Sequence, residues 1–117
     1  MDDTAPDMSV AYVDGLAPGM LIQFGTGDWR DGSVKGVAIS QEAFDRLEPA
    51  IRVAIPDGYD GARYGVTAIP SASLADLIAA LSTLSYDDTA TMTMIGEVTD
   101  WLALTNERGQ PVSIFGL

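Results

Sequence analysis

The feature that most constrains the fold of this chain is an apolar stripe at helical spacing. Its members recur at steps of three and four residues, as Leu74, Leu77, Ile78, Leu81 and Leu84. Residues at these steps share one side of an α-helix, whereas Asp76, Ala79 and Thr83 fall on other faces. Most helices of this length are stable only when their apolar side is buried. The rest of the chain must therefore provide a layer for this helix to pack against.

The start of this helix is expected at Pro70–Ser71. Ser71 or Ser73 can act as the N-cap, because a serine hydroxyl accepts a hydrogen bond from a free backbone N–H in the first turn. Ser73 and Asp76 also have the spacing of a capping box.

A second helix is predicted after Ser40, which is also a good N-cap residue. Phe44, Leu47 and Ile51 then form an apolar stripe that we assign to the core. Pro49 conflicts with one straight helix, because proline lacks an N–H and crowds the preceding turn. We expect either a kink or two short helices that meet at Glu48–Pro49.

A third helix is predicted after the polar break at residues 86–88. Its apolar positions are Met92, Ile95, Val98, Trp101 and Leu102. Glu97 and Asp100 mark its far side. Thr91, Thr93 and Gly96 lower its helix propensity, so tertiary packing must help it to form.

Five short segments have the composition of strands. They are Ser9–Val13, Met20–Phe24, Ser33–Ile39, Val66–Ile69 and Val112–Phe115, and glycine-rich loops follow at 25–32 and 56–65. Together with the helices, they predict an α+β fold in which a small, mostly antiparallel sheet carries two or three helices on one face. The 117 residues fit a single domain, 1–117, in which 1–8 form a flexible tail.

The composition argues against catalysis. The chain contains no cysteine and no histidine, which excludes disulfides, thiolate nucleophiles, Ser-His-Asp triads and the usual zinc sites. No P-loop, Rossmann fingerprint or marked carboxylate pair is present. We therefore predict a protein that is not an enzyme and that has no cofactor and no metal. The polar start lacks a signal peptide's apolar stretch, and we expect a cytoplasmic location.

Charge is the strongest functional signal. Seventeen acidic residues and six basic residues give a formal net charge of -11. Such a field repels nucleic acid and anionic membranes and attracts basic surfaces. We therefore expect a basic protein partner, with no direct contact to nucleic acid or membrane. The alternative is that the acidity serves only solubility.

Three acidic and aromatic loop segments are the candidate partner-binding positions. The first contains Asp28, Trp29 and Asp31, where tryptophan offers a large interface area at low entropic cost. One alternative is that Trp29 folds back against the edge of the core. Another is a calcium-binding loop, although Asp28 and Asp31 do not have the spacing of calcium ligands.

The second segment contains Tyr59 and Asp60, which offer a ring face and a carboxylate to a lysine or arginine. The third contains Asp87 and Asp88 beside Tyr86. For the second segment the alternative is an ordinary surface loop, and for the third it is a turn that caps a helix.

The arrangement of residues 38–117 resembles a family of small acidic bacterial proteins. The segments that carry the likeness are ISQEAFDRLEPAI, YGVTAIPSASLADLIAALSTL, the helix that contains Trp101, and the terminal VSIFGL. They are similar to immunity proteins of polymorphic-toxin and type VI secretion systems. The resemblance implies a protein that neutralises a cognate toxin effector by occluding its active site or holding it inactive. It implies no particular binding residue, because immunity surfaces differ with their toxins.

The sequence thus predicts an acidic module that neutralises a basic protein, most simply an immunity protein with its toxin. One alternative is a phage-type inhibitor, such as an anti-CRISPR protein or a nucleic-acid mimic, although its acids should then follow one extended face. Another is a structural homodimer that associates through Met92, Met94 and Trp101.

Overall fold

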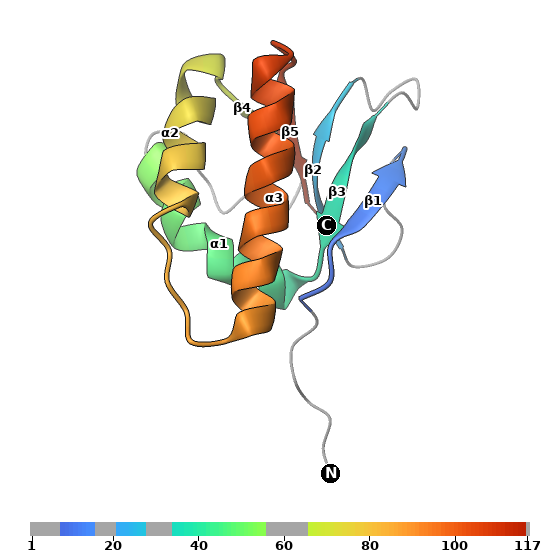
Figure 1. The fold of residues 1–117 in the computed structure, drawn as a ribbon. Coiled ribbons are helices and arrows are strands. Elements are labelled where there is room, and N and C mark those ends of the chain that lie inside the picture. The colour runs from blue at the N-terminus through green and yellow to red at the C-terminus, as the bar shows by residue number, and fades with distance from the viewer. Residues whose placement is uncertain (1–7, 16–20, 28–33, 56–65, 117) are drawn as a thin grey trace.

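The computed structural model describes residues 8–15, 21–27, 34–55 and 66–116. Within them the elements follow in the order β1 (Ala11–Asp14), β2 (Ile22–Thr26), β3 (Lys35–Ile39), α1 (Gln41–Ala54), β4 (Val66–Ile69), α2 (Ser71–Leu81), α3 (Thr89–Glu107) and β5 (Val112–Phe115). The strands form one sheet in the order β1-β3-β2-β5-β4, and every neighbouring pair is antiparallel. The helices lie against one side of this sheet (Figure 1). The predicted α+β fold is confirmed.

The core lies between the sheet and the helices. Phe24 of β2 stands opposite Val37 of β3 and Ile114 of β5, and all three side chains are fully buried. The ring of Phe24 packs against Phe44 of α1, with centroids 6.4 Å apart and planes tilted by 37°. Met8, which the sequence places in a flexible tail, is also buried in this core. The other expected tail residues, 1–7, lie outside the described residues.

The reverse side of the sheet also carries buried side chains. Gln23 alternates with the core residues of β2 and is paired in register with Ala38 and Phe115. All three are buried. The side-chain amide of Gln23 donates a hydrogen bond to the carbonyl oxygen of Gly15 at 3.0 Å, which satisfies one of its donors and ties β2 to the end of β1.

Strand β2 extends further than predicted. Gly25, which the sequence assigns to a loop, lies inside β2 opposite Gly36 of β3. A side chain on Gly25 would press against the ring of Phe115 and the side chain of Val34 at 2.9 Å. Glycine is therefore retained here for close packing and does not end the strand.

Helix α1 begins as predicted but is not divided in two. The hydroxyl oxygen of Ser40 accepts a hydrogen bond from the backbone N–H of Ala43 at 3.1 Å, so the predicted N-cap is confirmed. The helix continues through Pro49 to Ala54, and the expectation of two short helices is wrong. Buried residues before and after Pro49, among them Leu47 and Ile51, hold the segment against the core, and this packing outweighs the missing N–H.

The start of α2 differs from the prediction. The N-cap position is Pro70, no side chain caps the helix, and Ser71 and Ser73 lie inside it. The expected capping by these serines is therefore wrong. The reason is that β4 ends at Ile69, one residue before the N-cap, and the restricted backbone of Pro70 carries the chain from strand to helix. Leu84 lies beyond the end of α2 but still packs against the core.

Helix α3 is longer than its apolar pattern indicates. The carboxylate of Asp88 accepts hydrogen bonds from the Thr91 backbone N–H at 3.0 Å and the Thr91 hydroxyl at 2.6 Å. This cap starts the helix at Thr89. The threonines Thr99 and Thr105 donate their hydroxyl hydrogens to carbonyl oxygens four residues earlier, so they are accommodated within the helix.

Candidate functional site

Five of the seven predicted partner-binding residues lie outside the described residues. They are Asp28, Trp29, Asp31, Tyr59 and Asp60. Their roles stay predictions. The other two, Asp87 and Asp88, lie in the turn between α2 and α3.

The structure gives Asp88 the capping role that was the alternative to partner binding. The hydroxyl and then the backbone N–H of Thr91 hold the pKa of the Asp88 carboxyl below its ordinary value of 3.8. Both hydrogen bonds go to Oδ2. Asp87 is exposed beside it. Of these two residues, Asp87 has the carboxylate that no described contact occupies.

This turn is anchored to α1 by Tyr86. Its hydroxyl donates to the carbonyl oxygen of Arg46 at 2.8 Å, and the guanidinium carbon of Arg46 lies 5.5 Å from the centre of the Tyr86 ring. The backbone N–H of Tyr86 also approaches the sulfur of Met92 at 3.4 Å. These contacts fix the position of the turn. They also occupy a face of the Tyr86 ring that would otherwise be available to a partner.

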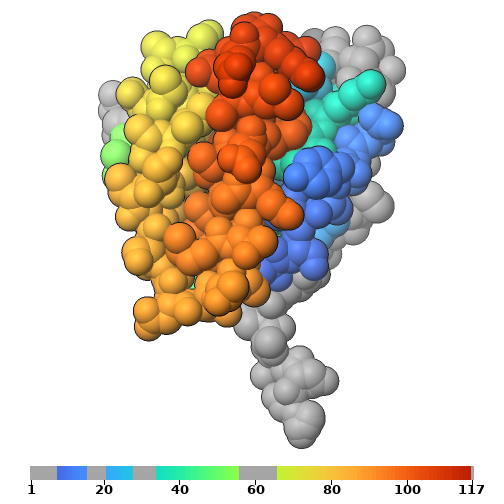
Figure 2. Space-filling view, in the orientation of Figure 1, coloured from blue at the N-terminus to red at the C-terminus, as the bar shows by residue number. Residues whose placement is uncertain are grey.

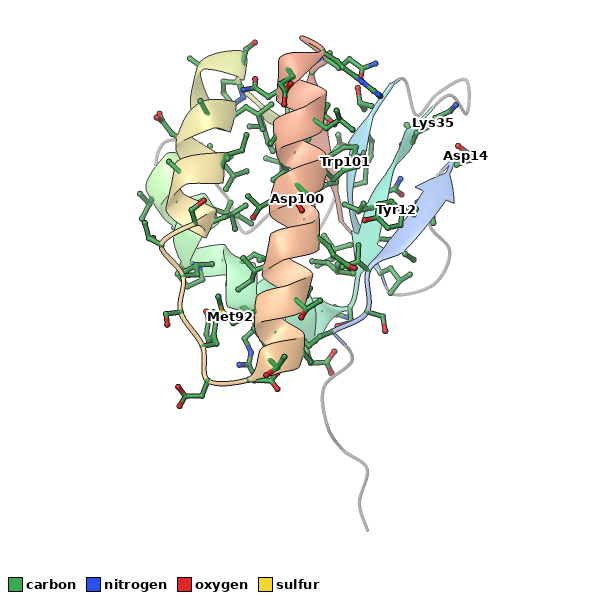
Figure 3. All side chains as sticks on the ribbon, viewed as in Figure 1. Tyr12, Asp14, Lys35, Met92, Asp100 and Trp101 are labelled. Carbon is green, nitrogen blue, oxygen red and sulfur yellow. The ribbon has the colours of Figure 1, made fainter. Side chains whose placement is uncertain are left out.

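A different part of the surface brings aromatic and charged side chains together. Figure 2 shows β1 lying alongside α3 on one face of the molecule. In Figure 3, Trp101 of α3 points toward the strands beside Tyr12 of β1, and Asp100 projects from the exposed side of α3. We call Tyr12, Asp14, Lys35, Asp100 and Trp101 the β1–α3 surface.

A shallow hollow lies within this surface. It has a volume of about 250 Å³ and is lined by Tyr12, Val13, Asp14, Lys35, Gly36 and Trp101. Tyr12 is 66% exposed, and Trp101 is half-buried against the core. The hollow thus has two aromatic walls, one of which is open to solvent.

The lining of the hollow carries one charge of each sign, and further carboxylates are exposed on α3. Asp14 and Lys35 approach to 4.0 Å, but both side chains are well exposed, so this ion pair contributes little. On α3, Glu97 and Asp100 are exposed, and within the described part of the chain neither has a basic residue within ion-pair distance. A cation that approaches this surface meets unneutralised carboxylates and an exposed ring face.

Only part of this site could be predicted from the sequence. Trp101 was assigned to the apolar face of its helix, and Tyr12 to an ordinary strand. Period-two alternation does put Tyr12 and Asp14 on the same side of their strand. It gives no sign that this side faces Trp101, because that contact depends on β1 being placed at the edge of the sheet nearest to α3.

The predicted self-association face is not formed. Met94 is fully buried in the core, while Met92 and Trp101 are partly exposed. The three side chains therefore do not share one surface, and the predicted face is wrong in its inclusion of Met94; a homodimer stays a prediction.

A second hollow, of about 570 Å³, lies between α1 and α2. Its lining is mostly small and apolar and consists of Pro49, Ala50, Val53, Asp76, Ala79, Ala80, Thr83 and Leu84. Among the described residues that line it, Asp76 is the only ionisable side chain.

The described residues form no cluster suited to a metal ion and no helix suited to crossing a membrane. No group of three or more acidic residues in these segments could hold a metal ion. None of the helices α1, α2 and α3 combines the length and the apolar character needed to cross a membrane.

Comparison with known proteins found no relative. No family model, no curated protein and no solved structure matches the chain.

Proposed function

We propose that this chain binds a basic protein and neutralises it, as an immunity protein does with its cognate toxin. The observation that carries the proposal is the excess of 17 acidic over 6 basic residues, together with the exposed Tyr12 ring beside the half-buried Trp101 on the β1–α3 surface. Carboxylates speed the encounter with a basic surface, and aromatic side chains slow dissociation by burying apolar area. The resemblance of residues 38–117 to immunity proteins supports the same reading.

The proposed inhibition requires no chemistry from this chain. A toxin that acts on nucleic acid or another anionic substrate must present a positively charged active site. An acidic domain that covers that site excludes the substrate by competition for the same charges.

The first experiment is affinity capture from the source cells with the tagged chain, at about 0.1 M and about 1 M salt. We expect one basic protein that stays bound at both salt concentrations and whose activity is abolished by an equimolar amount of this chain. Partners that all wash off at high salt, or no partner at all, would contradict the proposal. An identified partner that is a nucleic-acid-guided nuclease would instead support the phage-type inhibitor.

The contribution of the β1–α3 surface is tested by Tyr12→Ala. Because Tyr12 is 66% exposed, we expect its replacement to change the free energy of unfolding by no more than about 0.5 kcal/mol. Affinity for the captured partner should fall about tenfold or more, which corresponds to about 1.4 kcal/mol.

The matched control is Val53→Ala on α1. Val53 is even more exposed, at 72%, but lies outside the β1–α3 surface. It should leave affinity unchanged. Equal losses for the two variants would mean that the partner does not bind at the β1–α3 surface.

A further inference from the structure

Strand β1 is an open edge of the sheet. Among the described strands it pairs only with β3, in the register Ala11 with Ala38 through Asp14 with Lys35. An edge strand presents a row of N–H and C=O groups that can pair with another chain. Natural sheets often block such edges with lysine, proline or a bulge, and β1, with the sequence AYVD, contains neither lysine nor proline.

The hydrogen-bond pattern identifies which groups of β1 are open. The backbone N–H of Gly15 donates to the carbonyl oxygen of Val34, which continues the β1–β3 register by one pair. Hydrogen-bonded pairs alternate along an antiparallel ladder, so Val13 and Ala11 also direct their backbone groups to β3. The N–H and C=O groups of Tyr12 and Asp14 therefore point outward.

Side chains at the same two positions face the hollow. Tyr12 and Asp14 both line it, together with Trp101. Residues directly opposite each other on neighbouring strands have side chains on the same face of a sheet. In a strand added to β1, the residues opposite Tyr12 and Asp14 would therefore have their side chains on the side of the sheet that carries the hollow. The same residues would form hydrogen bonds with the backbone of Tyr12 and Asp14.

We propose that β1 takes up an extended basic segment of the partner as a sixth, antiparallel strand, with alternate lysine or arginine side chains over the β1–α3 surface. This inference rests on the proposed function and specifies how the partner is held. Backbone pairing supplies affinity that is independent of sequence, and the Asp14 carboxylate with the Tyr12 ring selects basic side chains.

The other edge of the sheet lacks these features. Strand β4 has the sequence VTAI, with no charged or aromatic side chain. It could pair with a strand but would not select a basic one. A second copy of this chain is a poor occupant of β1, because each copy carries a net charge of -11.

The probe is a blocked octapeptide of alternating arginine and valine. The chain contains two tryptophans, so Trp29→Phe leaves Trp101 as the single fluorescent reporter of the hollow. We expect a saturable change in Trp101 fluorescence below about 1 mM peptide. Amide hydrogen exchange should slow at Tyr12 and Asp14 and remain unchanged in β4.

Two N-methylated peptides provide matched controls. Arginines placed over the hollow stand opposite Tyr12 and Asp14, so their own amides form the new ladder. Methylating the arginine amides should weaken binding about tenfold or more, whereas methylating the valine amides should have little effect. Equal effects of the two modifications would overturn strand addition.

Variants at Asp14 separate charge from backbone pairing. Asp14→Asn removes the carboxylate but keeps the outward N–H, and Asp14→Pro removes both without deleting a bond to β3. We expect Asp14→Pro to bind the peptide several-fold more weakly than Asp14→Asn. Lys35→Ala should strengthen binding, because it removes a positive charge that lines the hollow.

Failure of this inference can be distinguished from failure of the proposed function. Absence of any saturable fluorescence change, or binding without protection of the Tyr12 and Asp14 amides, overturns the strand addition. Protection of these amides without peptide, with dimers in sedimentation, would identify a second copy as the occupant. If the affinity capture still yields a neutralised basic protein, the proposed function stands. If the peptide adds to β1 but no partner is captured, only the function fails.

Discussion

Asp88 links the titration of one side chain to the stability of a whole helix. Its carboxylate caps α3 through Thr91, and these hydrogen bonds are stronger to the ionised form. In the unfolded chain the carboxyl has no such partners and titrates at its ordinary value. The carboxylate therefore favours folding whenever it is ionised.

The sign of the pH dependence follows from the lowered pKa. The contribution of Asp88 should be complete at pH values above its ordinary pKa of 3.8 and should be lost as the pH falls from there through the folded pKa. We expect Asp88→Ala to lower the free energy of unfolding at pH 7, as measured by chemical denaturation. The difference between the two proteins should shrink as the solution is acidified.

Two further variants control this measurement. Asp88→Asn keeps a side-chain oxygen for the cap but does not titrate, so it should stay close to the native protein at neutral pH. Asp87→Ala removes the neighbouring exposed carboxylate. A loss of stability as large as that of Asp88→Ala would show that charge in the turn, and not the cap, is responsible.

At the scale of elements, β2 and β3 depend on a pair of facing glycines. Gly25 and Gly36 stand opposite each other, and a side chain on Gly36 would overlap the carbonyl oxygen of Phe24. This overlap is with backbone, which cannot move without disturbing the ladder. In contrast, Gly96 lies on the exposed side of α3, where an added methyl group would meet no atom within 4 Å.

Alanine substitution should therefore have opposite signs at these two glycines. We expect Gly36→Ala to lower the free energy of unfolding by about 2 kcal/mol or more, because it forces the central strands apart. Gly96→Ala should raise it by about 0.5–1 kcal/mol through better helix propensity. Thermal denaturation monitored by circular dichroism measures both, and a stabilising Gly36→Ala would contradict the close strand approach.

At the scale of the whole molecule, the charge opposes compaction. A net charge of -11 on 117 residues creates repulsion that grows when the chain folds. The described ion pairs include Asp14 with Lys35 at the surface and the half-buried Glu48 with Arg52, and the 6 basic residues of the chain cannot neutralise its 17 acidic residues. A basic partner that supplied the missing cations would therefore also stabilise the fold.

Screening this repulsion should stabilise the free protein. Raising sodium chloride from about 0.01 M to about 0.15 M shortens the Debye length from about 30 Å to about 8 Å. We expect the melting temperature at pH 7 to rise, as measured by scanning calorimetry. The rise should disappear near pH 4.1, where the net charge vanishes. An equal rise at both pH values would point to a general salt effect.

The sequence by itself determined the features that depend on neighbouring residues. Strands β4 and β5 have the predicted bounds, and Ser40 caps α1 as expected, because side-chain periodicity and capping act over a few positions. The acidic and aromatic loops are predicted in the same way, from the types of side chains and their local spacing.

Only the tertiary structure decided which of these side chains meet. In the folded protein Asp88 caps α3, α1 continues through Pro49, and β1 lies at the edge of the sheet beside α3. Strand order depends on contacts between segments far apart in the chain, and no local pattern records them. For this reason Tyr12 and Trp101 share a hollow that neither segment of the sequence indicates alone.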